Sequence, residues 1–200
     1  GWPAARVLPV PANRAEVVAR WNDTYFDNTP FAWSGSVAGC AAGDTTDAFK
    51  SAVLRRLNYF RAMAGLPGDL ALDPTLSAKA QQAALMMDAS DSLSHTPPAS
   101  WPCYSAVGAE AAGSSLLAYS NAPTRRVGLL DGYMLDRVAN NAAVGHRRWI
   151  LYPQLKRLGT GDAPQANALW VIGAGTTGPA ASDSAIAWPR RGFIPRPLAD

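Results

Sequence analysis

Two histidines, His95 and His146, supply all the imidazole in this chain of 200 residues. Imidazole is the one side chain that ordinarily changes charge near neutral pH, and it is also a common metal ligand. Acid–base chemistry near neutral pH, or metal binding through a ring nitrogen, therefore depends on these two positions. Glutamates are equally few, because the sequence contains Glu16 and Glu110 alone. Carboxylates close to either histidine are the next candidates for a polar site.

The elements that would position these residues are predicted from hydrophobic spacing and capping residues. Asn13 and Glu16 have the spacing of a capping box, and Asp73 followed by Pro74 is typical of a helix start. Residues 169–172 are typical of a half-buried strand. The predicted helices cover residues 13–26, about 47–64, a segment from 74 that ends at or just before His95, about 110–117 and about 124–135, and the predicted strands cover 155–162 and 167–173.

Composition excludes several classes of protein. Hydrophobic residues make up 48% and charged residues 16% of the chain, which is typical of a globular protein. The formal net charge is +3, and fifteen of the eighteen basic residues are arginines that lie scattered rather than in runs, so nucleic-acid binding is not expected. No stretch approaches about 18 uninterrupted apolar residues, so no transmembrane segment is expected.

The motifs, taken in order, resemble those of a known family. They run Leu57-Asn58-Tyr59-Phe60-Arg61, Gly65-Leu66-Pro67, Leu72-Asp73-Pro74-Thr75-Leu76, Ala80-Gln81, Leu93-Ser94-His95, Gly108-Ala109-Glu110, Asp131-Gly132-Tyr133-Met134 and Gly145-His146-Arg147. This order is similar to that of the CAP superfamily (cysteine-rich secretory proteins, antigen 5 and pathogenesis-related 1 proteins, also called SCP/TAPS), in its bacterial form. The resemblance implies three parts: an N-terminal extension with one helix (1–44), a CAP/SCP-like domain (45–175) and a Pro/Gly-rich C-terminal tail or linker (176–200). We expect Trp188 and Phe193 to anchor that tail.

The resemblance implies an α+β fold, an α-β-α sandwich with a small, mainly antiparallel sheet between helical layers. In the family, two histidines and two acidic residues line a central cleft, and some members hold a divalent metal there. Carried over to this chain, the set is His95, Glu110 and His146, with Asp136 as the second acid and Asp131 as its alternative. Zinc or another divalent cation is the implied metal, since neutral imidazole and carboxylate are both zinc ligands.

Two functions remain open from the sequence. One is a secreted module whose cleft binds a divalent metal, or a small apolar, lipid, sterol or peptide ligand, or a cell-surface component. The other is a metal-dependent hydrolase, peptidase or esterase-like, with Glu110, His95 and His146 as candidate catalytic residues. Neither a Gly-x-Ser-x-Gly nor a His-Glu-x-x-His motif occurs. An apolar cavity between helices would favour the first function.

Two cysteines, Cys40 and Cys103, lack the CxxC spacing of zinc or redox sites. Both lie in predicted loops that flank the second and third helices. The family resemblance also implies a secreted chain, or one in the periplasm or at the cell surface, where disulfides persist. We therefore predict a Cys40–Cys103 disulfide, which would close a loop of about sixty residues and stabilise the fold by about 4 kcal/mol.

Overall fold

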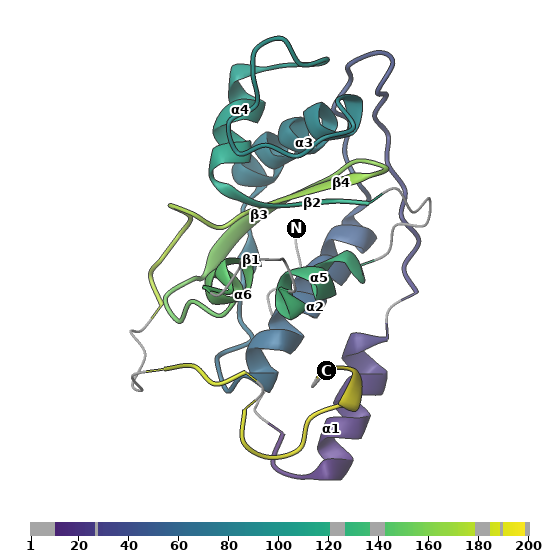
Figure 1. The fold of residues 1–200 in the computed structure, drawn as a ribbon. Coiled ribbons are helices and arrows are strands. Elements are labelled where there is room, and N and C mark those ends of the chain that lie inside the picture. The colour runs from purple at the N-terminus through teal and green to yellow at the C-terminus, as the bar shows by residue number, and fades with distance from the viewer. Residues whose placement is uncertain are drawn as a thin grey trace.

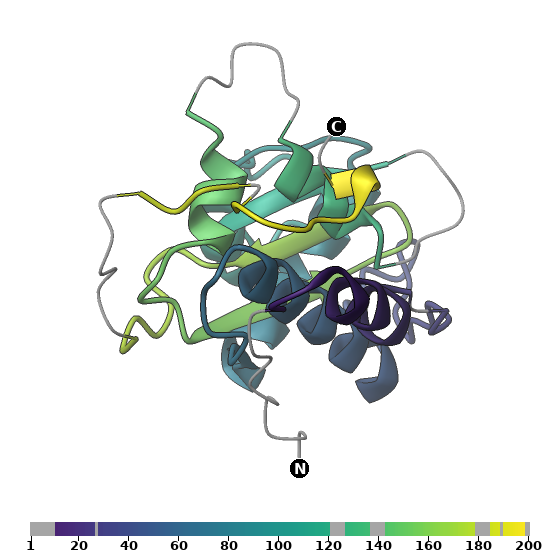
Figure 2. The same cartoon turned by 90° about the horizontal axis from the view of Figure 1, so that it is seen from below.

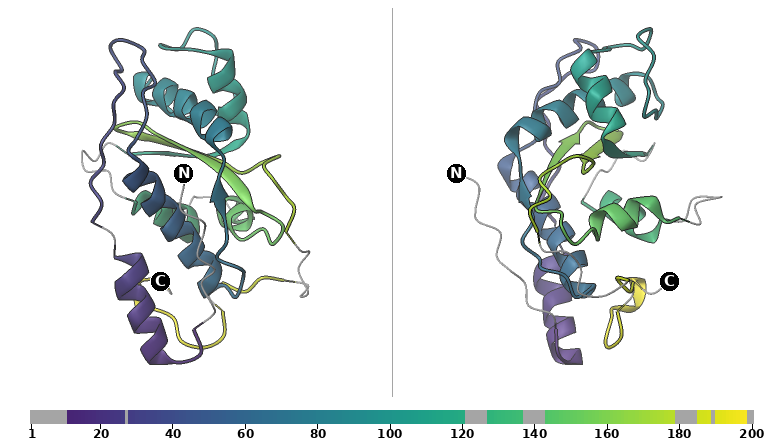
Figure 3. Two further views of the ribbon diagram at one scale, coloured as in Figure 1. Left: turned by 180° about the vertical axis from the view of Figure 1, so that it is seen from behind. Right: turned by 90° about the vertical axis from the view of Figure 1, so that its left-hand side faces the viewer.

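The computed structural model describes residues 11–26, 28–120, 127–136, 143–178, 185–188 and 190–198. A small sheet lies between two layers of helices (Figure 1). One layer holds α3 (Pro74–Ala89) and α4 (Ala106–Gly113). The other holds α2 (Asp47–Met63), α5 (Leu129–Leu135) and α6 (Gly145–Ile150), on the opposite side of the sheet (Figures 1 and 3). The predicted α-β-α sandwich is therefore confirmed.

Local capping signals set both ends of α2 and the start of α3 close to where the sequence predicted them. The Thr46 hydroxyl accepts a hydrogen bond from the Phe49 N–H at the start of α2 (3.2 Å), and Gly65, with φ 82°, follows its end. The Asp73 carboxylate accepts from two backbone N–H groups in the first turn of α3, where Pro74 leaves no N–H to satisfy. Local capping thus sets the boundaries of α2 and of the start of α3.

The sheet has the strand order β1-β3-β4-β2 and is mainly antiparallel. Its strands are β1 (Ala71–Leu72), β2 (Ser115–Tyr119), β3 (Arg157–Asp162) and β4 (Ala166–Trp170). β4 pairs antiparallel with both β2 and β3, and the short β1 pairs parallel with β3. A Cβ atom added to Gly161 would lie 2.1 Å from the carbonyl carbon of Ala80, so glycine in β3 is what lets α3 approach the sheet so closely.

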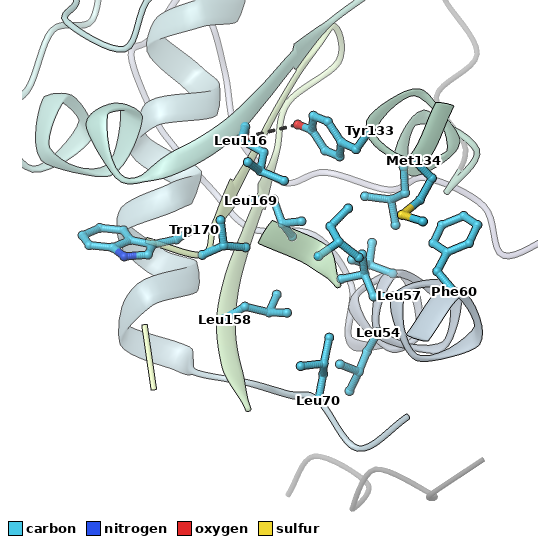
Figure 4. Packing of buried hydrophobic residues seen from close by; sticks show 14 of the residues in the cluster. Leu54, Leu57, Phe60, Leu70, Leu116, Tyr133, Met134, Leu158, Leu169 and Trp170 are labelled. Carbon is cyan, nitrogen blue, oxygen red and sulfur yellow. Dashed lines mark hydrogen bonds between the residues drawn. The ribbon is translucent and has the colours of Figure 1, made fainter. Parts of the chain in front are cut away.

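The main core lies between the sheet and the layer of α2 and α5. Leu158 and Leu169 point from the sheet toward Leu57 of α2, whereas Trp170 points to the side of α3 (Figure 4). This alternation follows from the two-residue repeat of a strand. Asn58 contributes the polar part of the packing, because its side chain both accepts from and donates to the backbone of Leu70 (2.8 and 3.2 Å).

Segments outside the sandwich pack on the lower end of α2. The helix α1 (Arg14–Arg20) continues into the single π-helical turn η1 (Trp21–Tyr25), and the C-terminal 3-10 turn η2 (Arg196–Leu198) lies at the same end of the molecule (Figures 1 and 3). Trp188 packs edge-on against Phe60 (6.0 Å between ring centres), as expected for an anchor. The prediction that Phe193 is a second anchor is wrong, because its side chain is 56% exposed. Leu198, in the same segment, is buried instead.

Other differences from the predicted elements have physical causes. Residues 110–117 were predicted as one helix, but α4 ends at Gly113 and Leu116 and Leu117 form part of β2, because they pair with β4 across the sheet. The helix predicted to reach His95 ends at Ala89. Residues 124–126 of the predicted helix 124–135 lie outside the described residues, and α5 begins at Leu129.

The Cys40–Cys103 disulfide is present, which confirms that prediction. It joins the loop before α2 to the loop between α3 and α4, and the two cysteines are separated by 63 positions in the sequence. The loop before α2 is further linked to α3, since Gln81 of α3 donates to the carbonyl of Ala42 (3.2 Å). In the part of the chain that the structure describes, no helix is long and apolar enough to cross a membrane.

Candidate functional site

The first polar site is a pair formed by Asp136, which follows α5, and His146 in α6. The His146 Nδ1 lies 2.7 Å from Asp136 Oδ1. Because an ionised carboxylate can only accept, Nδ1 carries the proton and Nε2 is the ring nitrogen available as a base or as a ligand. The Asp136 side chain is fully buried and that of His146 is 27% exposed. The pair therefore presents an oriented, accessible imidazole held from behind by a carboxylate.

Unusual backbone geometry brings this pair together. Asp136 ends α5 with φ 51°, and Val144 precedes α6 with φ 43°. A left-handed conformation is a clear outlier for a β-branched residue such as valine and costs on the order of 1–2 kcal/mol. Arg147 closes the gap between the helices: its guanidinium donates to the carbonyls of Met134 and Leu135 (2.6 and 2.9 Å) and its backbone N–H to Asp136 Oδ2 (3.3 Å). α5 and α6 accordingly lie side by side (Figure 2).

A buried polar network lies behind the pair. The ring of Tyr133 packs 5.3 Å from the ring of His146, and its hydroxyl donates to Asn167 Oδ1 (2.7 Å). Asn167 in turn donates to the Asp162 carboxylate (2.9 Å), which also accepts from the Thr160 hydroxyl (3.1 Å). These residues are almost fully buried, so their hydrogen bonds fix side-chain positions that apolar packing alone would leave free. Tyr133 is thereby held against the imidazole; Figure 4 shows its hydroxyl directed at Leu116 in the sheet.

Arg61 holds the far end of α6. It is fully buried and donates from Nε to the Pro67 carbonyl (3.0 Å) and from Nη1 to the carbonyls of Ile150 and Tyr152 (3.0 and 2.8 Å). Burial lowers the pKa of Arg61 to about 10, so the guanidinium remains charged at neutral pH. The side chain thus ties α2 to the end of the helix that carries His146.

His95 and Glu110 belong to the opposite layer of the sandwich. His95 lies in the loop after α3 and its Nδ1 donates to the Ala112 carbonyl of α4 (2.9 Å). Both carboxylate oxygens of Glu110, also in α4, accept from Lys79 of α3 (2.9 Å each). The Lys79 ammonium in addition lies 5.4 Å from the centre of the Trp170 ring. Each of these two residues is thus held by α3 or α4.

The four residues that the sequence placed in one cleft make contacts with different elements. Asp136 contacts His146, whereas His95 contacts Ala112 of α4 and Glu110, in α4, contacts Lys79 of α3. The helices α3 and α4 lie on the other side of the sheet from α5 and α6 (Figures 1 and 3). Throughout the described ranges, no group of three or more His, Cys, Asp and Glu side chains has the arrangement needed to hold a metal ion. A zinc site needs at least three protein ligands, so the donors as placed do not fit one.

Asp131, the alternative acid, belongs to a second polar cluster on α5. Its Oδ1 accepts from Arg56 of α2 and its Oδ2 from the Tyr25 hydroxyl, both at 2.6 Å. Arg56 also donates to the Tyr25 carbonyl (2.6 Å) and stacks over the Tyr25 ring at 3.6 Å. Burial, followed by the hydrogen bond to Asp131, raises the pKa of Tyr25 well above its usual value, so the hydroxyl stays protonated and donates.

A cavity of about 220 Å³ opens beside this cluster. It lies where α5 meets η1 and the C-terminal segment. Its wall includes two aromatic rings, three other apolar side chains and one carboxylate: Tyr25, Trp188, Met134, Leu135, Leu198 and Asp131. The sequence predicted Trp188 as an anchor of the C-terminal tail and Asp131 as an alternative acid, but it did not predict that these two residues line one cavity. Arg56 was the feature of the sequence that could have indicated this polar cluster. It lies on the apolar stripe of its helix, between Val53 and Phe60, and a charge at such a position requires a partner.

Comparison with known proteins gives one match. Residues 54–172 match the sequence model of the cysteine-rich secretory protein family, CAP. No curated protein and no solved structure matches the chain significantly. The matched range contains α3 to α6, the whole sheet and most of α2, and it leaves out Tyr25, Trp188 and Leu198 of the cavity wall.

Proposed function

Because the chain belongs to the cysteine-rich secretory protein (CAP) family, we propose that it is a secreted binding module that holds a small apolar ligand in the cavity beside α5. The cavity is the observation that carries this proposal. Ligand sites are typically concave and mostly apolar, with a few polar groups that fix orientation. Met134, Leu135 and Leu198 provide the apolar wall here, and Asp131 with Tyr25 provides the polar groups.

The size of the cavity restricts the ligand. An apolar cavity of about 150 Å³ is known to bind benzene, so about 220 Å³ accommodates a single ring with a few substituent atoms. A sterol or a long acyl chain is far larger than this space. Among the apolar ligands suggested by the family, the proposal is therefore restricted to small molecules.

Secretion is part of the proposal and rests on the disulfide. A Cys40–Cys103 bond persists in an oxidising compartment and is rare in a reducing one. The test is to compare the thiol content of protein recovered from the culture medium and from the cytoplasm of cells that express the natural gene. Oxidised protein outside the cell would support secretion, and accumulation inside the cell with two free thiols would contradict it.

Binding is tested with toluene as the probe and methyl NMR as the readout. We expect saturable shifts of the methyl signals of Met134 and Leu135, because both side chains line the cavity. Leu198→Trp should abolish these shifts by filling the space. Leu93→Trp is the matched control, since Leu93 is 43% exposed and lies in the loop after α3, on the other side of the sheet. Absence of saturable shifts in the wild-type protein would refute the proposal.

A divalent metal is the other ligand that the family resemblance implies, and the described donors do not fit a resident metal site. His146 could bind a metal through Nε2. The Asp136 carboxylate, however, already accepts hydrogen bonds from His146 Nδ1 and from the Arg147 N–H. The metal prediction is tested by calorimetry with Zn²⁺ on the wild type and on the double variant His95→Ala/His146→Ala. One-to-one binding that is lost in the double variant would support a shared site; equal heats would assign both histidines to structural roles.

A second candidate function, hydrolysis, is favoured by the Asp136–His146 contact. A buried carboxylate on Nδ1 fixes the tautomer in which Nε2 can remove a proton from water or from a hydroxyl nucleophile. Release of nitrophenol from p-nitrophenyl acetate tests this role. If it holds, His146→Gln and Asp136→Asn should each lower the rate at least about tenfold, and Arg148→Gln on the same helix should not. Equal rates in all four proteins would remove this candidate.

A further inference from the structure

The polar end of the cavity narrows the ligand class further. We infer that the preferred ligand is a small neutral aromatic compound with a hydroxyl group, whose ring occupies the cavity and whose O–H donates to the Asp131 carboxylate. This inference rests on the proposed binding function and adds to it the chemistry that the site selects.

Asp131 supplies the charge in the wall of the cavity. Among the described residues that line the cavity it is the one that carries a charge, and its side chain is 26% exposed. Its Oδ1 accepts from Arg56 and its Oδ2 from Tyr25. An ionised carboxylate has about four acceptor positions, so two remain for a further donor. The site therefore accepts a donor group from a ligand without losing a bond that it already makes.

The charge of Arg56 decides which donor fits best. Its guanidinium lies 2.6 Å from Asp131 and its side chain is 6% exposed, so the two groups form a nearly neutral pair at the edge of the cavity. An ammonium ligand would lose its hydration to meet a carboxylate that is already compensated. A carboxylate ligand would meet Asp131 as a like charge. A hydroxyl donates one hydrogen bond at a much lower desolvation cost, because it carries no charge.

Aromatic side chains form part of the cavity wall, which favours a ligand with a ring. Tyr25 stacks on Trp21 with 3.8 Å between ring centres and contacts Tyr59 at 5.3 Å, so its ring is held on two sides. Trp188 packs against Phe60 in an edge-on arrangement. Trp21 and the Arg56 guanidinium cover the two faces of Tyr25, so this ring presents its edge to the cavity. That edge, Trp188 and the thioether of Met134 form a preorganised wall for a third ring. Preorganised walls reduce the entropy cost of binding.

Four probes that share one ring separate the alternatives: toluene, p-cresol, benzylamine and benzoate, each titrated by methyl NMR. We expect p-cresol to bind about tenfold more tightly than toluene, as a net hydrogen bond to a charged acceptor implies, and benzylamine and benzoate to bind more weakly than p-cresol. Equal binding of toluene and p-cresol, or tighter binding of benzylamine or benzoate, would overturn the inference and leave the proposed function intact. Failure of all four probes would refute the proposed function itself.

Two substitutions test the role of Asp131. Asp131→Asn should reduce the affinity for p-cresol to that for toluene, although it leaves the buried Arg56 without its partner and could prevent folding. Tyr25→Phe avoids that problem. It removes the hydroxyl that donates to Asp131 Oδ2, so the hydrogen bond from the ligand hydroxyl should contribute more to the affinity. The ratio of p-cresol to toluene affinity should therefore rise at least about threefold. Tyr104→Phe, at a 39% exposed tyrosine away from the cavity wall, is the control. An unchanged or lower ratio in Tyr25→Phe would overturn the inference.

Discussion

Replacement of Arg61 by methionine tests whether a fully buried arginine stabilises the fold or merely fills space. Methionine keeps the length and flexibility of the side chain and removes every donor. The substitution leaves the carbonyls of Pro67, Ile150 and Tyr152 without the guanidinium, at positions that had hydrogen bonds of 2.8–3.0 Å. Because Ile150 ends α6, we expect loss of stability and looser positioning of His146 together.

The size of the effect follows from two opposing terms. Three hydrogen bonds to a charged donor contribute about 1.5–3 kcal/mol each. Against them stands the cost of burying the charge, which lowers the pKa of Arg61 to about 10 from its usual, much higher value and corresponds to about 3 kcal/mol. The carbonyl bonds outweigh the burial cost, so Arg61→Met should lower the free energy of unfolding by about 3 kcal/mol. For a chain of this length the melting temperature should fall by roughly 6–12 °C.

Denaturant titration followed by tryptophan fluorescence measures this change. Arg55→Met is the matched control, because Arg55 is exposed on the same helix and its replacement should change stability by less than about 0.5 kcal/mol. Arg61→Lys should lose nearly as much as Arg61→Met, since one ammonium does not reproduce the fork of donors that reaches the carbonyls of Pro67, Ile150 and Tyr152 together. An Arg61→Met protein as stable as the wild type would show that the hydrogen bonds do not exceed the burial cost, and the reasoning would be refuted.

Three further predictions concern other parts of the molecule. Opening the Cys40–Cys103 bond should lower the free energy of unfolding by about 4 kcal/mol, measured by denaturant titration with and without reductant; a change below about 1 kcal/mol would contradict the chain-entropy argument. Val144→Gly should raise stability by about 0.5–1 kcal/mol in a thermal melt, because glycine adopts positive φ without strain, and a destabilised variant would count against the strain at that position. Burial raises the pKa of Tyr25 and Tyr59 above the value of about 10 that they have when unfolded, so stability should fall as the pH rises above about 10; spectroscopic titration showing both phenols ionising normally in the native protein would disprove this.

Much of the fold could be predicted from the sequence, because its signals are local. The Asp73-Pro74 start of α3, the Gly65 end of α2 and the apolar spacing within α2 depend on neighbours a few residues away. The apolar run at residues 169–172 predicted the second strand of the central hairpin. By contrast, Leu116 and Leu117 are compatible with a helix as well as with a strand. Their pairing with β4, which lies far along the chain, selects the strand.

The candidate site was harder to predict because it depends on distant contacts. The family resemblance named His146 and Asp136 but gave no means of telling that His95 contacts Ala112 and that Glu110 contacts Lys79. The cavity depends on Tyr25 meeting Trp188, which are far apart in sequence and have no local pattern in common. A charged residue on an apolar helix stripe, such as Arg56, was the one local sign that a distant acid would lie opposite.

The parallel pairing of β1 with β3 has a consequence for synthesis. Leu72 is synthesised well before Leu158, with which its strand pairs. Arg61 is likewise synthesised well before Ile150 and Tyr152, whose carbonyls accept its hydrogen bonds. At ribosomal rates of about 5–20 residues per second, that interval lasts on the order of 4–17 s, during which the apolar faces of α2 and α3 have no sheet to cover them. The two central strands β3 and β4 are among the last elements to emerge, so the sandwich closes as a whole near the end of translation. A nascent chain of this topology depends on being kept from aggregation, by chaperones or by passage across a membrane in unfolded form, until residue 170 is available.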